Sequence, residues 1–271
     1  MNELTQTDFD KVRPLFAPLA HHLTIDAILS GLTPGQVWVD DVAVPQTAVC
    51  WYGHRLYLSG RADDPATRRA CARLLADMYA PDAQARGKAA YIAHGSLAWR
   101  AYMPEVLAAW EPTQYGRLYY RLDARGRDWT PRLPDGYTLR PVDAALLADA
   151  TLTNREWVTE EMVSERPSIA DFLAKSFGWC VQHGERIVAW CMSEYNTGHR
   201  CELGIATDEA QQRKGLATGV GTAVIRHALA QNVYDIGWDC WANNLPSIAT
   251  AEKLGLRRVA ETAVWFGFWP R

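Results

Sequence analysis

The stretch ATDEAQQRKGLATGVGTAVIRHALAQ, residues 206–231, decides the fold of the C-terminal half of this chain. Its apolar residues recur every four positions and predict an amphipathic helix with one face against a sheet. These positions are Leu216, Val220, Val224 and Ala228. The first amides of a helix have no partner within the helix, and together with the helix dipole they attract anions. We therefore predict an anion site where this helix begins.

The residues at the helix start favour a phosphate group. Gly215 and Ala217 have small side chains, which let a phosphate oxygen approach the backbone amides. Arg213 and Lys214 add positive charge at the same place. The order and spacing of these residues match neither a P-loop nor a dinucleotide-binding fingerprint. The alternative is a helix start with incidental cations on a solvated surface.

A family resemblance rests on two motifs in order. Gln212-x-x-Gly215-x-Ala217 follows the predicted strand CELGIATD and resembles the pyrophosphate-binding signature Q/R-x-x-G-x-G/A of the GNAT acyltransferase superfamily. Downstream, NLPSIATAEKLGL resembles a second GNAT motif through Asn244, Ser247 and Gly255-Leu256. The resemblance covers roughly residues 137–270. Within the superfamily, the sequence is similar to the zwittermicin-resistance type, which carries an extra domain in front. Ala251 stands where many members have a tyrosine that acts as proton donor.

The resemblance implies an α+β chain of two domains. We expect a C-terminal GNAT fold over residues 137–271, with a mixed, mostly antiparallel twisted sheet flanked by helices. A smaller, degenerate GNAT-like α/β domain is expected over residues 1–126, because its predicted strands and helices follow a similar order. That half has SGRADDPATRRA where the phosphate motif would stand. A linker is expected at residues 127–136, where Gly, Pro and charged residues interrupt the apolar pattern.

The resemblance implies acetyl-CoA as the acyl donor. The pyrophosphate would bind the backbone amides of residues 213–218, and the pantetheine would pair with the edge of the strand at residues 203–207. Asn244 and Ser247 would contact the pantetheine near the sulfur, although Asn244 also suits a helix cap. The expected cofactor-binding residues are Leu203, Ile205, Ala206, Thr207, Gln212, Arg213, Lys214, Gly215, Leu216, Ala217, Thr218, Asn244 and Ser247.

Catalysis by direct attack of an amine on the thioester requires a base, because an amine with a pKa of about 10.4 is almost wholly protonated at neutral pH. Glu202 is the expected base, since many GNAT enzymes place a carboxylate on this strand. A structural ion pair is the alternative. A one-residue shift or a bulge would turn Glu202 away from the site and Cys201 toward it. Ser247 or a water could return the proton to the leaving thiolate.

The acceptor site is expected to hold carboxylates and an aromatic side chain suited to a cationic amine. The candidates are Trp157, Glu160, Glu161 and Asp239. A solvated acidic helix is the alternative for Glu160 and Glu161, and a structural hydrogen bond is the alternative for Asp239.

Composition excludes other function classes. A net charge of -3 argues against a nucleic-acid partner, and no apolar run is long enough for a membrane span. The N-terminus lacks the features of a signal peptide, so we expect a cytoplasmic protein. Six scattered cysteines without a C-x-x-C pair predict reduced, mostly buried thiols. No metal is expected; His21, His22 and Asp26 form the one alternative cluster considered.

We therefore expect an acetyl-CoA-dependent N-acetyltransferase acting on a primary amine of a small molecule, with an antibiotic as one candidate. A homodimer is left open. Two alternatives are an N-acetyltransferase for protein or peptide amines and an acyl-CoA-binding sensor without turnover. The absence of the usual tyrosine favours the sensor.

Overall fold

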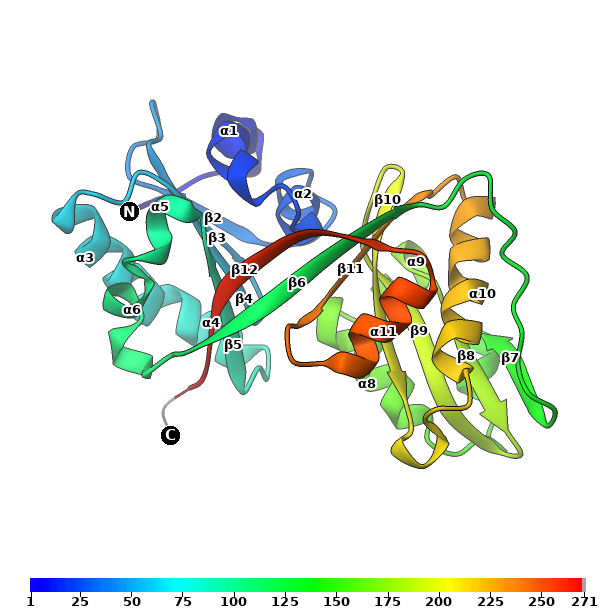
Figure 1. The fold of residues 1–271 in the computed structure, drawn as a ribbon. Coiled ribbons are helices and arrows are strands. Elements are labelled where there is room, and N and C mark those ends of the chain that lie inside the picture. The colour runs from blue at the N-terminus through cyan, green and yellow to red at the C-terminus, as the bar shows by residue number, and fades with distance from the viewer. Residues whose placement is uncertain (270–271) are drawn as a thin grey trace. The chain divides into compact units, whose positions relative to one another are not determined.

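The computed structural model describes residues 1–269, and these form two compact units. Unit 1 consists of Met1–Arg117 and the chain from Glu261 onward, and unit 2 consists of Leu118–Ala260. Figure 1 gives the labels used below. None of the helices described has the length and apolar character needed to span a membrane.

Unit 1 contains a mixed sheet in the order β1-β2-β3-β4-β5-β12. Its strands are β1 (Asn2–Glu3), β2 (Gln36–Val39), β3 (Thr47–Tyr52), β4 (Arg55–Gly60), β5 (Ala90–Gly95) and the second part of β12 (Arg257–Phe268). Its α-helices are α1 (Arg13–Phe16), α2 (Leu23–Leu29), α3 (Pro65–Leu74), α4 (Ala80–Ala85), α5 (Leu97–Arg100) and α6 (Met103–Val106). A π-helical turn, Leu75–Tyr79, joins α3 to α4, and short 3-10 turns lie at Gln6–Val12, Ala17–Leu19 and Ala108–Trp110.

In unit 2 the strands of the mixed sheet follow the order β6-β11-β10-β9-β8-β7. Its strands are β6 (Thr113–Asp123, shared with unit 1), β7 (Tyr137–Pro141), β8 (Gly178–His183), β9 (Arg186–Thr197), β10 (Arg200–Thr207) and β11 (Asp235–Trp241). Its helices are α7 (Ala144–Ala148), α8 (Arg155–Glu165), α9 (Ile169–Lys175), α10 (Leu216–Ala230) and α11 (Leu245–Lys253), with a 3-10 turn at Glu209–Gln211.

The two units repeat one arrangement of strands. In unit 1 an antiparallel meander ends at β4, which α3 connects to the parallel strand β5. In unit 2 an antiparallel meander ends at β10, which α10 connects to the parallel strand β11. This repetition agrees with the internal similarity predicted from the order of elements in the sequence.

The compact units divide the chain differently from the predicted boundaries. The end of β12 pairs with β5 in unit 1, from Trp265↔Ala93 to Phe268↔Ala90, so this part of β12 belongs with the N-terminal half. The predicted linker belongs to unit 2, where Trp129 is buried and its Nε1 donates to the Ala124 carbonyl at 2.8 Å. A Cβ at Gly219 of α10 would come within 2.6 Å of the Arg132 carbonyl oxygen, so this glycine allows the segment to approach the helix.

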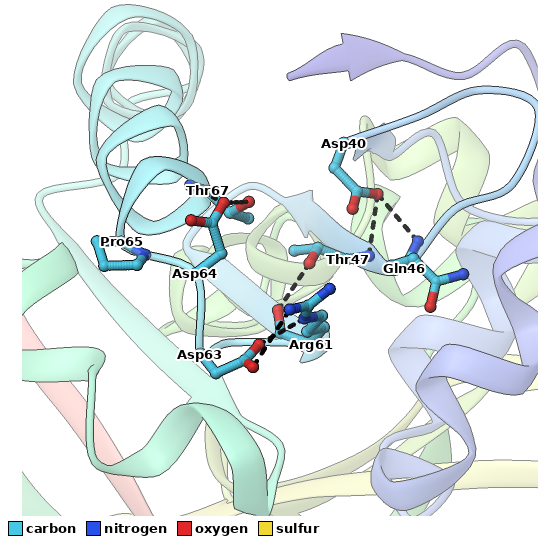
Figure 2. Close-up of a pocket in the computed structure, with 8 residues that line it drawn as sticks. All are labelled: Asp40, Gln46, Thr47, Arg61, Asp63, Asp64, Pro65 and Thr67. Carbon is cyan, nitrogen blue, oxygen red and sulfur yellow. Dashed lines mark hydrogen bonds and ion pairs between the residues drawn. The ribbon is translucent and has the colours of Figure 1, made fainter.

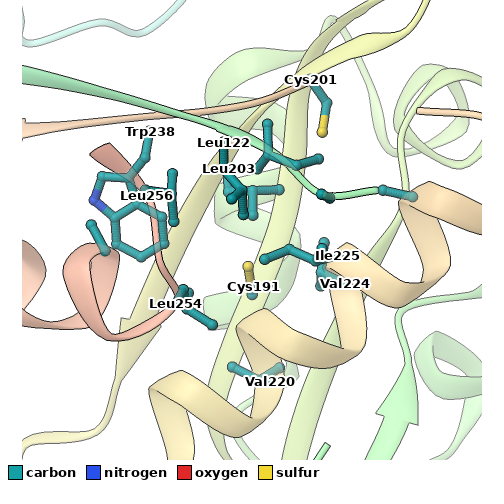
Figure 3. Close-up of a cluster of buried hydrophobic side chains, with 14 of the residues drawn as sticks. Leu122, Cys191, Cys201, Leu203, Val220, Val224, Ile225, Trp238, Leu254 and Leu256 are labelled. Carbon is teal, nitrogen blue, oxygen red and sulfur yellow. The ribbon is translucent and has the colours of Figure 1, made fainter. Parts of the chain in front are cut away.

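Two apolar layers cover the faces of the unit 2 sheet. On one face α10 packs through Val220 and Val224 against strand residues such as Cys201 and Leu203 (Figure 3). On the other face α8 and α9 pack on residues of β8 and β9 that include Trp190 and Met192. All six cysteines are buried and free, which confirms the prediction of buried thiols. Burial raises the pKa of Cys180 to about 12, as expected for a thiol in a core.

Candidate functional site

The start of α10 exposes unbonded backbone amides. Gly215 is the N-cap residue, has φ +80°, and provides no capping side chain. The first bond of the helix runs from the Gly219 amide to the Gly215 carbonyl at 3.0 Å. Among the residues described, no protein acceptor binds the amides of residues 213–218. A Cβ at Gly215 would meet nothing within 4 Å, so the space beside this residue is open.

The two predicted cations lie at this helix start but have different surroundings. Lys214 Nζ donates to Gln211 Oε1 at 2.6 Å and to the Tyr137 hydroxyl at 3.1 Å. Arg213 is exposed, with φ +64°, and no acidic group in the described chain pairs with its guanidinium. Gln212 Nε2 lies 3.5 Å from the Thr207 carbonyl oxygen. The helix start therefore combines free amides with two nearby positive charges, which suits an anion.

Strands β10 and β11 separate beside this helix start. Their parallel pairing in the described chain runs from Arg200↔Asp235 to Glu202↔Gly237. Beyond that point β10 keeps its pairing with β9 as far as Thr207↔Ala189, whereas β11 continues to Trp241 without a β10 partner. The edge of residues 203–207 is therefore free of β11 at the carboxyl ends of both strands. An extended ligand arm could add its own hydrogen bonds to this edge.

Glu202 faces α8, and Cys201 faces α10. Cys201 and Leu203 belong to the core under α10, so the residue between them points to the opposite face of the sheet. Glu202 is buried, at 8% exposure. A register shift does occur beside this position, as the sequence allowed, and it leaves Glu202 on the face that α8 covers.

Two glycines on the α8 face make room for carboxylates. A Cβ at Gly237 would lie 2.9 Å from Glu202 Cγ. A Cβ at Gly204 would overlap the Glu194 carboxylate and lie 3.2 Å from Glu161 Oε1. Glu161, Glu194 and Glu202 therefore gather on one face, where β10 and β11 separate. Glu194 was not predicted; its pairing with Glu202 could have been found by counting the register of the β9–β10 hairpin, but the one-residue shift conceals it.

The remaining predicted acceptor residues occupy different environments. Asp239 is half-buried and lies between the core residues Trp238 and Cys240, so it faces the same side as Glu202. Trp157 is half-buried against Trp190, with ring centroids 5.8 Å apart, and so contributes to the core under α8. Glu160 is exposed, whereas Glu161 is half-buried beside Gly204.

The second motif forms the start of α11. Asn244 is the N-cap, and its Oδ1 accepts from the Ser247 amide at 3.2 Å, which is the capping role considered from the sequence. Ser247 Oγ accepts from Trp238 Nε1 at 3.1 Å, so its own O–H proton is left to donate elsewhere. Ala251 is fully buried in the core under α10, and no phenolic group occupies its place.

The corresponding helix start in unit 1 is closed by its own side chain. Asp64 caps α3 by accepting from the Ala66 amide at 3.1 Å and the Thr67 amide at 3.0 Å. The Thr67 hydroxyl and these amides lower the pKa of Asp64, so the carboxylate persists. The adjoining cavity of about 460 Å³ is lined by Asp40, Gln46, Thr47, Arg61, Asp63, Asp64, Pro65 and Thr67 (Figure 2). Fixed negative charge therefore occupies the start of α3, whereas the corresponding start of α10 offers open amides.

The considered metal cluster in unit 1 is not assembled. Asp26 Oδ1 pairs with Arg13 Nη1 at 2.9 Å, and the rings of His21 and His22 lie 4.3 Å apart. His22 also contacts His94, with ring centroids 4.3 Å apart, and Tyr57, at 5.0 Å. In the described part of the chain no three His, Cys, Asp or Glu side chains are placed to hold a metal ion.

Solved structures with this fold cover nearly the whole chain. A GCN5-related N-acetyltransferase-like protein from Streptococcus suis 89/1591 has a TM-score of 0.74 and 22% identity, covering 97% of this chain and 99% of its own. A GCN5-related N-acetyltransferase from Sphaerobacter thermophilus has a TM-score of 0.64 and 12% identity, with 98% and 94% covered. A tandem GNAT protein from the clavulanic acid biosynthesis pathway has a TM-score of 0.58 and 14% identity, with 100% and 98% covered.

Sequence comparisons agree with the fold. An uncharacterised N-acetyltransferase of Bacillus subtilis strain 168, YdfB, is 25% identical over 266 residues, which is 98% of each chain. The profile of the GNAT acetyltransferase family matches residues 13–265, which includes both compact units. The chain therefore belongs to the GNAT acetyltransferase family.

Proposed function

We propose that this chain transfers an acetyl group from acetyl-CoA to a primary amine of a small cationic molecule. The observation that carries the proposal is the position of the free α10 amides at the carboxyl ends of two separating strands. Three carboxylates, those of Glu161, Glu194 and Glu202, gather where β10 and β11 separate, on the sheet face opposite to α10. An anionic donor and a cationic acceptor could thus approach one point from two sides of the sheet.

The residues present fit acetyl-CoA, which supplies an activated acyl group as a thioester. The open space at Gly215 leaves the amides of residues 213–218 accessible to a pyrophosphate, with Arg213 and Lys214 contributing charge. The free edge of residues 203–207 would pair with the pantetheine amides. Asn244 and Ser247 would lie beside this arm at the start of α11.

Proton transfer falls to residues of β10 and α11. The amine nitrogen attacks the carbonyl carbon, an N–C bond forms, and the C–S bond breaks to release a thiolate. Glu202 accepts the amine proton, directly or through water, because it lies on the face that carries the other carboxylates. Ser247 can return a proton to the thiolate, since its oxygen already accepts from Trp238 and its hydrogen is available.

A thiol-release assay tests this proposal. The complete chain would be incubated with acetyl-CoA and a panel of monoamines, diamines, cationic aminoglycoside-type antibiotics and peptides with free amino groups. We expect release with small cationic amines. Release with peptides alone would replace the small-molecule acceptor by a protein or peptide amine. CoA binding without release for any amine would favour a sensor, the alternative that the buried Ala251 supports.

We further propose that unit 1 is a degenerate copy that binds no CoA, because Asp64 occupies its helix start. The test requires the complete chain, since β12 completes the unit 1 sheet and a fragment ending near residue 117 lacks that strand. Isothermal titration should give one CoA per chain. Two sites per chain would contradict the proposal.

A further inference from the structure

A β-bulge in β9 turns two consecutive side chains toward the same helix. Arg200 pairs with Thr197 and Glu202 pairs with Glu194, so Tyr195 and Asn196 together lie opposite the single residue Cys201. Regular strand alternation would place neighbouring residues on opposite faces. Here Glu194 lies beside Glu161 of α8, and the Tyr195 hydroxyl donates to Glu165 of α8. The extra residue makes both contacts possible.

The backbone of Tyr195 is strained. Its φ is +48°, in the left-handed region that an aromatic residue rarely adopts, and its side chain is fully buried. Such conformations persist only where the surrounding contacts require them. At this position those contacts include the hydrogen bond from Tyr195 to Glu165, a residue that is only 7% exposed.

The same bulge also holds the end of α9. Asn196 Nδ2 donates to the Lys175 carbonyl, the last residue of α9, at 2.8 Å. Glu165 is the last residue of α8. Two adjacent bulge residues thus fix the carboxyl ends of both helices that cover the face carrying Glu202.

We infer that Tyr195 is a positioning residue that sets the acceptor side of the site. Glu161 precedes Glu165 by four residues, so it lies one helical turn away on the same side of α8. Fixing Glu165 against the bulge therefore fixes how closely Glu161 approaches Gly204 and Glu194. This inference rests on the proposed function, because it assigns those carboxylates to the recognition of a cationic acceptor.

The test compares matched tyrosine variants of the complete chain. Tyr195→Phe removes the hydroxyl and keeps the ring; Tyr79→Phe is the control, since Tyr79 is also fully buried and donates to the His54 carbonyl at 2.9 Å in unit 1. We expect Tyr195→Phe to raise KM for the amine about tenfold, the scale of a lost hydrogen bond to a charged group, with Kd for CoA unchanged. Tyr79→Phe should change neither constant.

Variants of Glu165 test the coupling. Glu165→Gln keeps an oxygen that accepts from Tyr195 and should retain most of the affinity for the amine, whereas Glu165→Ala should reproduce the Tyr195→Phe defect. The double variant Tyr195→Phe/Glu165→Ala should be no worse than either single variant, because both remove the same bond. Additive losses, or equal KM values in Tyr195→Phe and Tyr79→Phe, would overturn the inference.

Amide hydrogen exchange separates this inference from the proposed function. In Tyr195→Phe the amides of α8 should exchange faster than in the unmodified chain, while those of α10 should not change. Unchanged exchange in α8 would overturn the inference whatever the activity. A chain that releases no CoA with any amine, yet shows faster α8 exchange in Tyr195→Phe, would overturn the proposed function and leave the anchoring role in place.

Discussion

The side chain of Glu202 lies against Gly237 across the last parallel pair between β10 and β11. A Cβ at position 237 would be 2.9 Å from Glu202 Cγ, closer than side chains normally approach. The absence of a side chain at Gly237 of β11 therefore determines where the Glu202 carboxylate can lie. This contact connects the choice of residue on one strand to the proposed base on its neighbour.

Gly237→Ala should displace Glu202 and lower kcat/KM by about tenfold or more, since small misplacements of reacting groups are costly. Kd for CoA should not change, because the amides of α10 are untouched. Gly184→Ala is a suitable control: it has φ +59° in an exposed turn, and an added Cβ meets nothing within 4 Å. The control should lose some stability and keep its kcat/KM. Equal kcat/KM in Gly237→Ala and the unmodified chain would argue against a reacting role for Glu202.

Glu202→Gln should keep CoA binding and lower turnover by about a hundredfold or more, the usual scale for a general base. The loss should be largest at low pH, where the amine is almost wholly protonated, and should shrink as free amine accumulates at high pH. Glu185→Gln, in the exposed turn between β8 and β9, should behave like the unmodified chain. Full activity of Glu202→Gln at all pH values would transfer the role of base to Asp239 or to water.

Gly215→Glu should abolish the increase in Tm that CoA produces. Binding at a hundredfold excess over Kd adds about 2.7 kcal/mol to the free energy of unfolding, and a carboxylate before the α10 amides would repel the pyrophosphate. Gly215→Lys is the matched control, because any side chain at φ +80° carries the same backbone strain while the charge is reversed. The lysine variant should retain part of the Tm increase. Equal increases in both variants would remove the proposed phosphate site.

The free energy of unfolding should fall as the pH decreases below about 6.5. Burial lowers the pKa of His22 and His94 well below the ordinary value of 6.5, and His21, His54, Arg55 and Arg117 lower one or both further. The unfolded chain then binds more protons than the folded chain, so stability is present above pH 6.5 and is lost on acidification.

His94→Phe should therefore reduce the pH dependence of Tm between pH 5 and 7. Each buried histidine contributes at most about 1.4 kcal/mol per pH unit. His199→Gln is the control, since His199 is exposed in unit 2. Identical pH profiles for His94→Phe and the unmodified chain would show that His94 is not a source of the acid sensitivity.

The sequence alone determined the order of elements and the helix start with open backbone amides. Apolar periodicity and local capping residues specify these features, because a helix and its N-cap involve residues only a few positions apart. Asp64 at α3 and Gly215 at α10 illustrate this, since each could be identified from its immediate neighbours.

Tertiary structure alone decided which carboxylates meet and which strands complete each sheet. The pairing of β12 with β5 joins residues more than 160 positions apart, and no local pattern encodes such a partner. The bulge at Tyr195 shifts the register between β9 and β10 by one residue, so Glu194 pairs with Glu202 and meets Gly204 and Glu161. It also places Tyr195 beside α8, the helix that Glu194 faces, although simple alternation would put these two neighbours on opposite faces. Strand pairing and side-chain packing across the sheet fix these contacts, because hydrogen bonds between strands depend on register and on the space that each glycine leaves.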